Sequence, residues 1–513
     1  MKISKYSAMT FALMTGAMLV TSCATDVETG LNTDPEGKAI TFAASVGQAT
    51  RAQQIDVTNL GDFAVIGRGI HPDGVLYNSY MIGSADGGDI AEFQNTVDAG
   101  NSMWKLNRTV YWPATTQRAL FIGYTTLMRG ESSASGVLSS GTFGVNPAND
   151  QPYINGFAPA KADLSTTGNY NTGVWADGFE QKDLLIAFTQ QQRGTSTVVD
   201  LHFNHALTQV SIKAGRMNMD EDNDERIVRI KGAWLVNAQK TGKLSSEISV
   251  NKTTNIATNK IKWGESDTES GTDTELETYG AYYNDFIPLK KNGDDNLLRS
   301  TLMLVPQSLK AWNGSSETTT GAYIMLLCRV ELQHNGETHK GANITDVAID
   351  AKNKKHYHQL FPVNTTKYDG SEYGFVCVPI STDWGNAEAY KETVSNIDTE
   401  GTKCKGMGKH YTFNLDICGA KTGAGVYPPI PTEEDEAQAL INKLIPTGAT
   451  VSAWVLEGGQ YISKTVPLSV ITARAADKEV GEPVLDDPIK FSVTVQDWAT
   501  EDWKDGNGKD PEF

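Results

Sequence analysis

The side chains with the greatest capacity for chemistry in this chain are two closely spaced pairs of histidines. His202 and His205 lie in the segment LHFNH, and His356 and His358 lie in KKHYHQ. Histidines spaced in this way can share a metal ion, but a protein site for zinc needs three or four ligands. No cysteine or carboxylate stands at ligand spacing beside either pair. We therefore expect no metal site, and a hydrogen-bonded structural role for His205.

An acidic run offers a second set of ligands. Asp220, Asp222 and Asp224 alternate like the first positions of a calcium-binding loop. Such a loop needs glycine at its sixth position and a bidentate glutamate at its twelfth, where this chain has Glu225 and Lys231. The run is better explained as a solvated linker.

Motifs for catalysis are also missing. The chain contains no G-x-S-x-G, H-E-x-x-H or phosphate-binding loop sequence. Cys328 and Cys377 lie inside apolar runs, where a cysteine acts as a small buried hydrophobe. Cys404 and Cys418 flank one strand-like run, and whether they form a disulfide stays open. We expect a protein without catalytic residues, cofactor or metal.

The N-terminus has the form of an export signal. Lys2 and Lys5 precede an apolar run at 9–20, and small residues then lead to Cys23 in the sequence VTSC. This ending resembles the lipobox of bacterial lipoproteins, in which the cysteine accepts a diacylglycerol and the segment before it is removed. Cys23 is thus the predicted lipidation site, unless 1–22 is an ordinary signal peptide with an accidental cysteine at the cut.

Composition excludes one class of partner. The 513 residues include 44 Lys and Arg against 62 Asp and Glu, giving a net charge of −18. Such a surface repels phosphate, so nucleic acid is not expected as a partner. After the signal, no stretch is apolar for the 18 or more residues that a membrane helix needs.

The sequence after the signal predicts β-structure. Short runs rich in β-branched and aromatic residues are separated by clusters of Gly, Asn, Asp and Pro, which is typical of all-β proteins. One helix is predicted at 433–444. The predicted strands are 39–46, 63–66, 109–112, 119–124, 184–188, 198–203, 207–213, 227–236, 301–305, 323–332, 375–379, 409–417, 453–455 and 489–498.

Polar stretches interrupt these strands. The charged run at 219–225 is the predicted domain boundary. Segments 129–180 and 251–280, rich in Ser, Thr, Gly and Asn, are predicted to be long surface insertions.

An ordered set of motifs resembles the fimbrillin family, the subunits of the lipoprotein-derived (type V) pili of Gram-negative anaerobes. The set spans nearly the whole chain. It consists of the lipobox at Cys23, ITFAASV (40–46), TRA (50–52), FAVI (63–66), Trp104, YWP (111–113), LFIGY (120–124), DLLIA (183–187), LHFNHAL (201–207), LMLVPQ (302–307), GKHYTF (408–413) and VTVQDW (493–498).

The resemblance implies two tandem transthyretin-like β-sandwich domains and a maturation route. A trypsin-like, Arg-specific protease would cut between Arg51 and Ala52, removing the first strand. The open sheet edges left behind would pair with a strand of the next subunit. That donor would be the C-terminal strand region, with site residues Ile489, Phe491, Val493, Val495 and Trp498.

The expected organisation follows from these assignments. It comprises a signal peptide at 1–22, a lipidated propeptide with the first strand at 23–51, an N-terminal sandwich at 52–219 and a C-terminal sandwich at 220–513. The precursor would reside in the outer membrane through its lipid and the processed protein in a surface fimbria. Its partners would be other pilin subunits, the protease, and a receptor on a host or bacterial surface.

Alternatives stay open at this level. A monomeric outer-membrane lipoprotein that binds glycans would keep Cys23 and its lipid, whereas a fimbrillin would lose both at Arg51. An envelope hydrolase is disfavoured because no nucleophile and base can be named. The last strand could also remain permanently in its own sheet, as in the tip subunits of the family.

Overall fold

The structure is a computed structural model of the chain. It describes residues 39–46, 60–94, 103–113, 115–126, 141–159, 181–196, 198–215, 225–264, 276–289, 295–298, 301–307, 309, 311–314, 321–335, 346–350, 355–363, 370–380, 407–418, 423–430, 434–457, 460–485 and 490–497.

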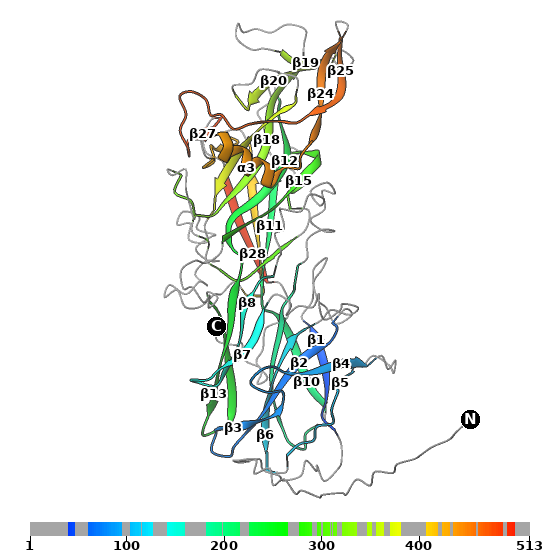
Figure 1. Cartoon of the computed structure of the whole chain (residues 1–513), viewed down its shortest axis with the longest axis vertical. Helices are drawn as coiled ribbons and strands as arrows, with labels where there is room; N and C mark the ends of the chain where they lie inside the picture. Colours follow the sequence, from blue (N-terminus) through cyan, green and yellow to red (C-terminus); the bar gives the residue numbers. More distant parts are fainter. Residues whose placement is uncertain are drawn as a thin grey trace, which may run out of the picture.

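The described residues form two β-lobes stacked along the long axis of the molecule (Figure 1). The first lobe contains β1 (Thr41–Val46), β2 (Phe63–Ile70), β3 (Leu76–Ile82), β4 (Asp89–Gln94), β5 (Met103–Leu106), β6 (Arg118–Thr125), β7 (Thr142–Asn146), β8 (Gln151–Phe157), β9 (Leu185–Gln192), β10 (Val198–His205), β13 (Gly242–Asn251) and β14 (Ile256–Gly264).

The second lobe contains the remaining strands and, among the described residues, the single helix. They are β11 (Thr208–Gly215), β12 (Glu225–Gln239), β15 (Leu276–Pro288), β16 (Asp295–Asn296), β17 (Leu302–Leu304), β18 (Tyr323–Asn335), β19 (Asp346–Asp350), β20 (Lys355–Phe361), β21 (Glu372–Pro379), β22 (Lys409–Asp416), β23 (Gly425–Val426), α3 (Glu434–Leu444), β24 (Thr450–Glu457), β25 (Gln460–Pro467), β26 (Ser469–Ile471), β27 (Pro483–Val484) and β28 (Lys490–Asp497).

The main sheet of the first lobe closes on itself. Its strand order is β3-β2-β4-β5-β1-β10-β9-β6, and β6 pairs in addition with β2. The ring from β2 through β4, β5, β1, β10, β9 and β6 therefore returns to β2, while β3 lies outside it. A closed sheet of this kind has no free strand edge.

A second, four-stranded sheet packs against this ring. Its order is β14-β13-β8-β7, so a hairpin from beyond residue 219 joins two strands from before it.

The predicted division at 219/220 stays a prediction. The prediction that 129–180 and 251–280 are surface insertions is wrong in part, because β7 and β8 lie in the first and β14 lies in the second.

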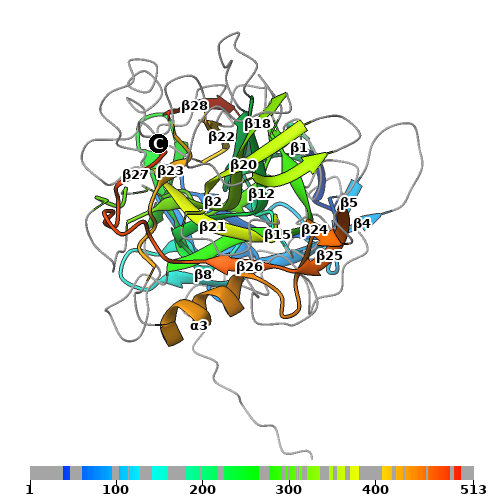
Figure 2. The ribbon, with the colours of Figure 1, turned by 90° about the horizontal axis from the view of Figure 1, so that it is seen from above.

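The second lobe is a sandwich. One sheet has the order β16-β11-β22-β28, and the other runs β15-β12-β18-β21-β23-β27. On β18, Ile324 and Leu326 face the core between the sheets, whereas Met325 and Leu327 belong to a second apolar cluster that includes Ala437 of α3. The helix covers the outside of this sheet (Figure 2). Strands buried on both faces read as continuous apolar runs.

The two lobes share one continuous path of backbone. β10 ends at His205 and β11 begins at Thr208, with Ala206 and Leu207 fully buried between them. The carbonyl of Leu207 accepts a hydrogen bond from the backbone N–H of Gly408 (2.9 Å). These contacts fix the passage from one lobe to the other.

The all-β prediction with two sandwich-like lobes is confirmed, and α3 confirms the helix predicted at 433–444. Burial of Cys328 and Cys377 is also confirmed.

The strand predicted at 109–112 is wrong: this segment runs outside the sheets, although Val110 and Trp112 are buried. Among the described residues, no helix has both the length and the apolarity to span a bilayer.

Tight packing inside the first lobe gives a test of the fold. A Cβ atom added at Gly123 of β6 would lie 2.9 Å from the Phe203 ring, whereas one added at Gly264 of β14 would meet nothing within 4 Å. Gly123→Ala is expected to lower the free energy of unfolding by about 1–3 kcal/mol through overpacking. Chemical denaturation measures this change, and Gly264→Ala is the control. Equal stabilities of the two variants would contradict the packing described.

Candidate assembly site around the first strand

β1 is held along both of its edges. It runs parallel to β10 over six residue pairs, from Thr41 opposite Val198 to Val46 opposite Phe203. On its other edge Phe42 lies opposite Trp104 of the antiparallel β5. β1 is thus the strand that joins β5 to β10 and completes the ring.

The inward face of β1 is anchored by one aromatic side chain. The ring of Phe42 is fully buried and meets Phe63 and Phe121 edge to face, with centroids 6.3 Å and 6.2 Å away. Phe63 also contacts Phe203 and Trp104, with centroids 4.9 Å and 5.5 Å away. Aromatic pairs of this geometry contribute about 0.5–1.5 kcal/mol each beyond the area they bury.

The other inward residues follow the period of two of a strand. Ile40 is buried, and Ala44 and Val46 are partly buried against the same cluster. Their neighbours Leu201 and Phe203 on β10 are likewise buried. Complete burial of a large apolar side chain stabilises a fold by about 1.5–3 kcal/mol. Without β1, the first lobe would have an apolar slot between two open strand edges.

The outward face of β1 is polar. Ser45 is exposed, and its hydroxyl forms a hydrogen bond with Nδ1 of His202 on β10 (2.8 Å). Asp200, opposite Ala43, is exposed too. β1 is therefore an amphipathic strand that presents one face to the core and the other to water.

The predicted role of His205 as a hydrogen-bonded structural residue is confirmed. Its Nδ1 lies 3.0 Å from Oδ2 of Asp183, and both side chains are buried. Among the described residues no group of three or more His, Cys, Asp or Glu side chains is arranged to hold a metal ion.

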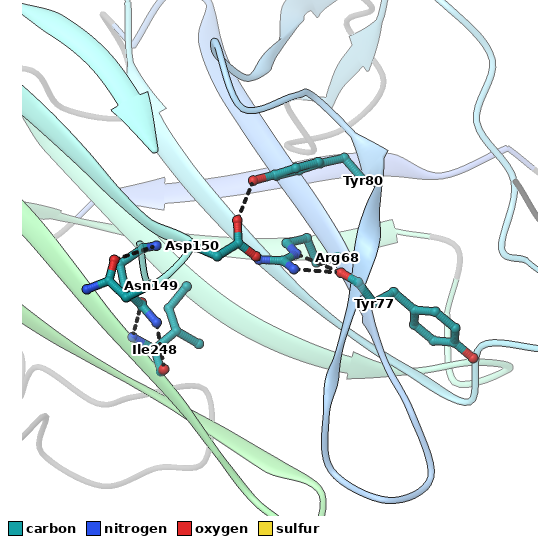
Figure 3. A network of polar contacts seen from close by, with 7 residues as sticks. Arg68, Tyr77, Tyr80, Asn149, Asp150 and Ile248 are labelled. Atoms are coloured by element: carbon teal, nitrogen blue, oxygen red, sulfur yellow. Dashed lines mark hydrogen bonds and ion pairs between the residues drawn. The ribbon is translucent and has the colours of Figure 1, made fainter. Parts of the chain in front are cut away.

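A polar network links the ring to the second sheet of the first lobe (Figure 3). Arg68 of β2 is almost fully buried and forms an ion pair with Asp150 at 2.5 Å. Its Nε and Nη2 donate to the carbonyl of Tyr77 at 3.0 Å and 2.6 Å. The hydroxyl of Tyr80 donates to Asp150 at 3.4 Å, and burial and the Asp150 charge raise the pKa of that hydroxyl. Arg68 thus fastens the turn between β7 and β8 to β2 and β3.

Tyr124 makes a second such link. Its ring stacks on Phe143 of β7 with centroids 5.0 Å apart. Its hydroxyl accepts a hydrogen bond from the backbone N–H of Gly88 at 2.9 Å. Burial raises the pKa of Tyr124 to about 12, although this hydrogen bond acts in the opposite direction. The hydroxyl therefore stays protonated at physiological pH.

The second lobe contains a buried charge cluster of its own. Glu331 accepts hydrogen bonds from Nε of Arg329 at 2.5 Å and from Nε of Arg229 at 3.0 Å. Burial would raise the pKa of this carboxyl, but the two guanidinium groups outweigh it and hold the pKa below its usual range. The cluster has a structural role, with every charge paired inside the protein.

The described part of the proposed donor strand lies in β28, at the edge of its sheet. It pairs along eight residues with β22 and, among the described strands, with no other. Phe491, Val493 and Val495 occupy every second position, opposite Leu415, Phe413 and Tyr411.

Several predicted site residues lie outside the described residues. These are Cys23, Arg51, Ala52, Ile489 and Trp498, and Cys404 lies outside as well. The lipidation, the cleavage and the strand exchange therefore stay predictions, and the disulfide state of Cys404 and Cys418 stays open.

Sequence reasoning identified β1 and, as a strand at 198–203, β10, but it did not identify β5, the pairing of these strands or the hairpin that packs behind them. β5 is only four residues long, and β10 is about 150 residues away in the chain. The hairpin β13–β14 did carry a signal, because Leu244, Ile248 and Val250 alternate with polar residues before the turn NKTTN.

The fold and site together define an all-β protein in which one N-terminal strand completes a closed sheet. A comparison with protein families matches residues 80–417, more than half of the chain, to the fimbrillin-like family. The chain belongs to this family, and the predicted resemblance is confirmed. By its family it is accordingly a fimbrial protein of the cell surface and not an enzyme.

Some solved structures also resemble this chain, at low sequence identity and low structural similarity. A fimbrial protein from Bacteroides vulgatus is 13% identical over 74% of this chain and 95% of its own, with a TM-score of 0.40. A protein from Parabacteroides distasonis assigned to cell adhesion is 10% identical over 90% and 96%, with a TM-score of 0.35. The family assignment does not rest on these structures. A comparison with curated proteins finds no match.

Phe42 provides a direct test of how β1 is held. Phe42→Ala is expected to lower the free energy of unfolding of the first lobe by about 3–5 kcal/mol, because it leaves a cavity between Phe63 and Phe121. Ser45→Ala on the exposed face is expected to lose about 1 kcal/mol or less. Denaturation of both variants measures the difference. Similar losses would contradict the inward placement of Phe42.

Proposed function

We propose that this protein is a structural subunit, in the stalk or at the tip, of a type V fimbria that supports adhesion. The precursor is exported, acylated at Cys23 and held in the outer membrane by its lipid. An Arg-specific protease then cuts between Arg51 and Ala52, β1 leaves, and a C-terminal strand of another subunit takes its place. The observation that carries the proposal is that β1 alone joins β5 to β10 in the ring.

The position of the cut supports this role. β1 ends at Val46 and β2 begins at Phe63, so Arg51 lies in the connection between them. Cleavage there leaves β1 attached to the lobe only by hydrogen bonds and packing. Its loss creates two unpaired edges, which are templates for another strand.

Sheet pairing is compatible with the exchange. Among the described strands β28 pairs only with β22, over eight residue pairs, whereas a strand in the β1 position has six pairs with β10 and two with β5. A donated β28 therefore regains as many backbone pairs as it gives up. It also covers the apolar slot, as in donor-strand complementation.

The two strands carry matching apolar residues. Ile40, Phe42, Ala44 and Val46 follow one another at every second position, with the aromatic residue second. Ile489, Phe491, Val493 and Val495 repeat this order with the same spacing. In the register that this match implies, Phe491 of the donor occupies the site of Phe42, between Phe63 and Phe121 of the acceptor.

The N-terminal residue and intact mass of protein sheared from cells test the processing step. We expect Ala52 at the N-terminus, in high-mass oligomers that resist heat. An acylated Cys23, in a monomer that detergent alone releases, would contradict the proposal and favour the glycan-binding lipoprotein.

Blocking the cut should block assembly. Arg51→Ala is expected to leave folding unchanged but to abolish surface fibres, because β1 stays covalently linked in its place. Electron microscopy of cells carrying this variant measures the effect, with Arg474→Ala, between β26 and β27 of the second lobe, as a control for loss of an arginine elsewhere. Fibres in normal number with Arg51→Ala would rule out the maturation route.

The donor register can be tested on β28. Phe491→Asp is expected to stop polymerisation, because a carboxylate cannot enter the apolar site of Phe42 without a large desolvation cost. Ser492→Asp, one position along on the opposite face, is the matched control and should still assemble. Oligomer ladders on gels give the readout, and denaturation of each monomer checks its fold. Equal assembly by both variants would contradict the register.

A further inference from the structure

Three neighbouring strands form a wall with two different faces. β2 pairs with β6 along eight residues, and β6 pairs with β9. Phe121 of β6 points inward, where its ring meets Phe42 of β1. Leu120 and Ile122 belong instead to a separate apolar cluster with Ile248 of β13 and Ala257 of β14. The wall thus has β1 on one side and the β13–β14 hairpin on the other.

One residue at the turn of this hairpin contacts β6, β9 and the segment that follows β2, all at the same end of the wall. The carbonyl of Asn255 accepts hydrogen bonds from Nε2 of Gln190 on β9 (2.8 Å) and from Nη1 of Arg118 on β6 (3.4 Å). Its Nδ2 donates to the carbonyl of Pro72, just after β2 (2.9 Å). Asn255 has a φ of 53°, a conformation that asparagine tolerates better than most residues.

Gln190 is bound from both ends of its amide group. Besides donating to Asn255, it accepts a hydrogen bond from the backbone N–H of Ala257 on Oε1 (2.7 Å). A single side chain of β9 therefore binds two backbone groups where the turn leads into β14.

The hairpin is also fixed along its length. Gln151 of β8 donates to the carbonyl of Ile248 (3.2 Å) and accepts from its N–H (2.6 Å). The turn just before Gln151 carries Asp150, which is paired with Arg68 of β2 (Figure 3). At the other end of the hairpin, Nε1 of Trp263 donates to the carbonyl of Ala206, between the lobes (2.6 Å).

We propose that the β13–β14 hairpin is a positioning element for the β1 slot, acting through Gln190 and Asn255. It fixes the relative placement of β2, β6 and β9, so the wall keeps the curvature that receives a strand after β1 has left. A sheet that is no longer closed is free to flatten, and pre-organisation of a site removes part of the cost of binding. This inference rests on the proposed function.

The contacts described lie on the face of the wall away from β1. Their effect on a strand in the slot is therefore indirect. The hairpin belongs to the half of the chain beyond residue 219, so the acceptor slot depends on both halves of the sequence.

Binding of a strand in trans tests the inference. Gly47–Arg51 of the full chain is replaced by the recognition sequence of a site-specific protease, and the folded protein is then cleaved. A fluorescent peptide of residues 39–46 is added in excess, and anisotropy measures its affinity as it displaces the cleaved segment. Hydrogen exchange of β10 amides reports occupancy of the slot.

The variant is Gln190→Ala, which removes both hydrogen bonds to the hairpin turn. Gln191→Ala is the matched control, because the amide of this neighbouring glutamine donates to Ser196 of its own turn (2.7 Å). Gln190→Ala is expected to weaken peptide binding at least about tenfold, which corresponds to a loss of about 1.4 kcal/mol of binding free energy. Gln191→Ala should bind the peptide with the affinity of the unsubstituted protein. The melting temperature of uncleaved Gln190→Ala should lie within a few degrees of that of the uncleaved, unsubstituted protein.

The outcomes separate the positioning role of the hairpin from the proposed strand exchange. Equal affinities of Gln190→Ala and Gln191→Ala would overturn the role of the hairpin and leave the slot intact. Melting of uncleaved Gln190→Ala far below the control would show a general stabilising role and overturn positioning. No peptide binding by the cleaved, unsubstituted protein would overturn the proposed strand exchange, and the inference with it.

Discussion

Closure of the first-lobe sheet by β1 is the constraint on which the rest of the structure depends. Backbone N–H and C=O groups in a sheet need partners, and a ring supplies them to every strand. In this ring the partners of β5 and β10 come from a segment of six residues near the N-terminus. Its buried Phe42 meets aromatic rings from both β2 and β6. Few hydrogen bonds and one anchor thus decide whether the lobe is closed or open.

The connectivity of β1 makes it separable from the ring. Strands joined by tight hairpins are held to their neighbours by the turn, but β1 runs parallel to β10, and a parallel pair needs a long connection. A single cut between β1 and β2 therefore breaks no hairpin. Removal of β1 leaves the remaining strands of the ring joined along the chain.

The two lobes are built from interlocked segments. β10 continues into β11 through buried residues, and the β13–β14 hairpin returns from the second half of the chain to pack on the first lobe. Each lobe is therefore built from segments on both sides of residue 219, since β11 belongs to the second lobe and β13 and β14 belong to the first. The buried pairing of Arg329 with Glu331 and Arg229 adds polar contacts within the second lobe.

Local patterns in the sequence determined much of this protein. Alternation of apolar and polar residues predicts strands such as β11 and β28, because side chains in a strand alternate between two faces. Acidic residues before an apolar run, followed by proline, predict α3. Amphipathic β1 and the ordered motifs lead to the fimbrillin-like family, since each of these signals lies within a few consecutive residues.

The tertiary structure alone decided which strands meet. Pairing of Phe42 with Trp104 and of Val46 with Phe203 joins segments far apart in the chain, and no local pattern specifies a distant partner. For the same reason the polar strand β14 was mistaken for an insertion: its Ala257 and Trp263 are buried by contacts with other segments. The sequence by itself determined that an N-terminal strand with one apolar face exists. Its place in the ring, and the hairpin behind the opposite wall, depend on long-range packing.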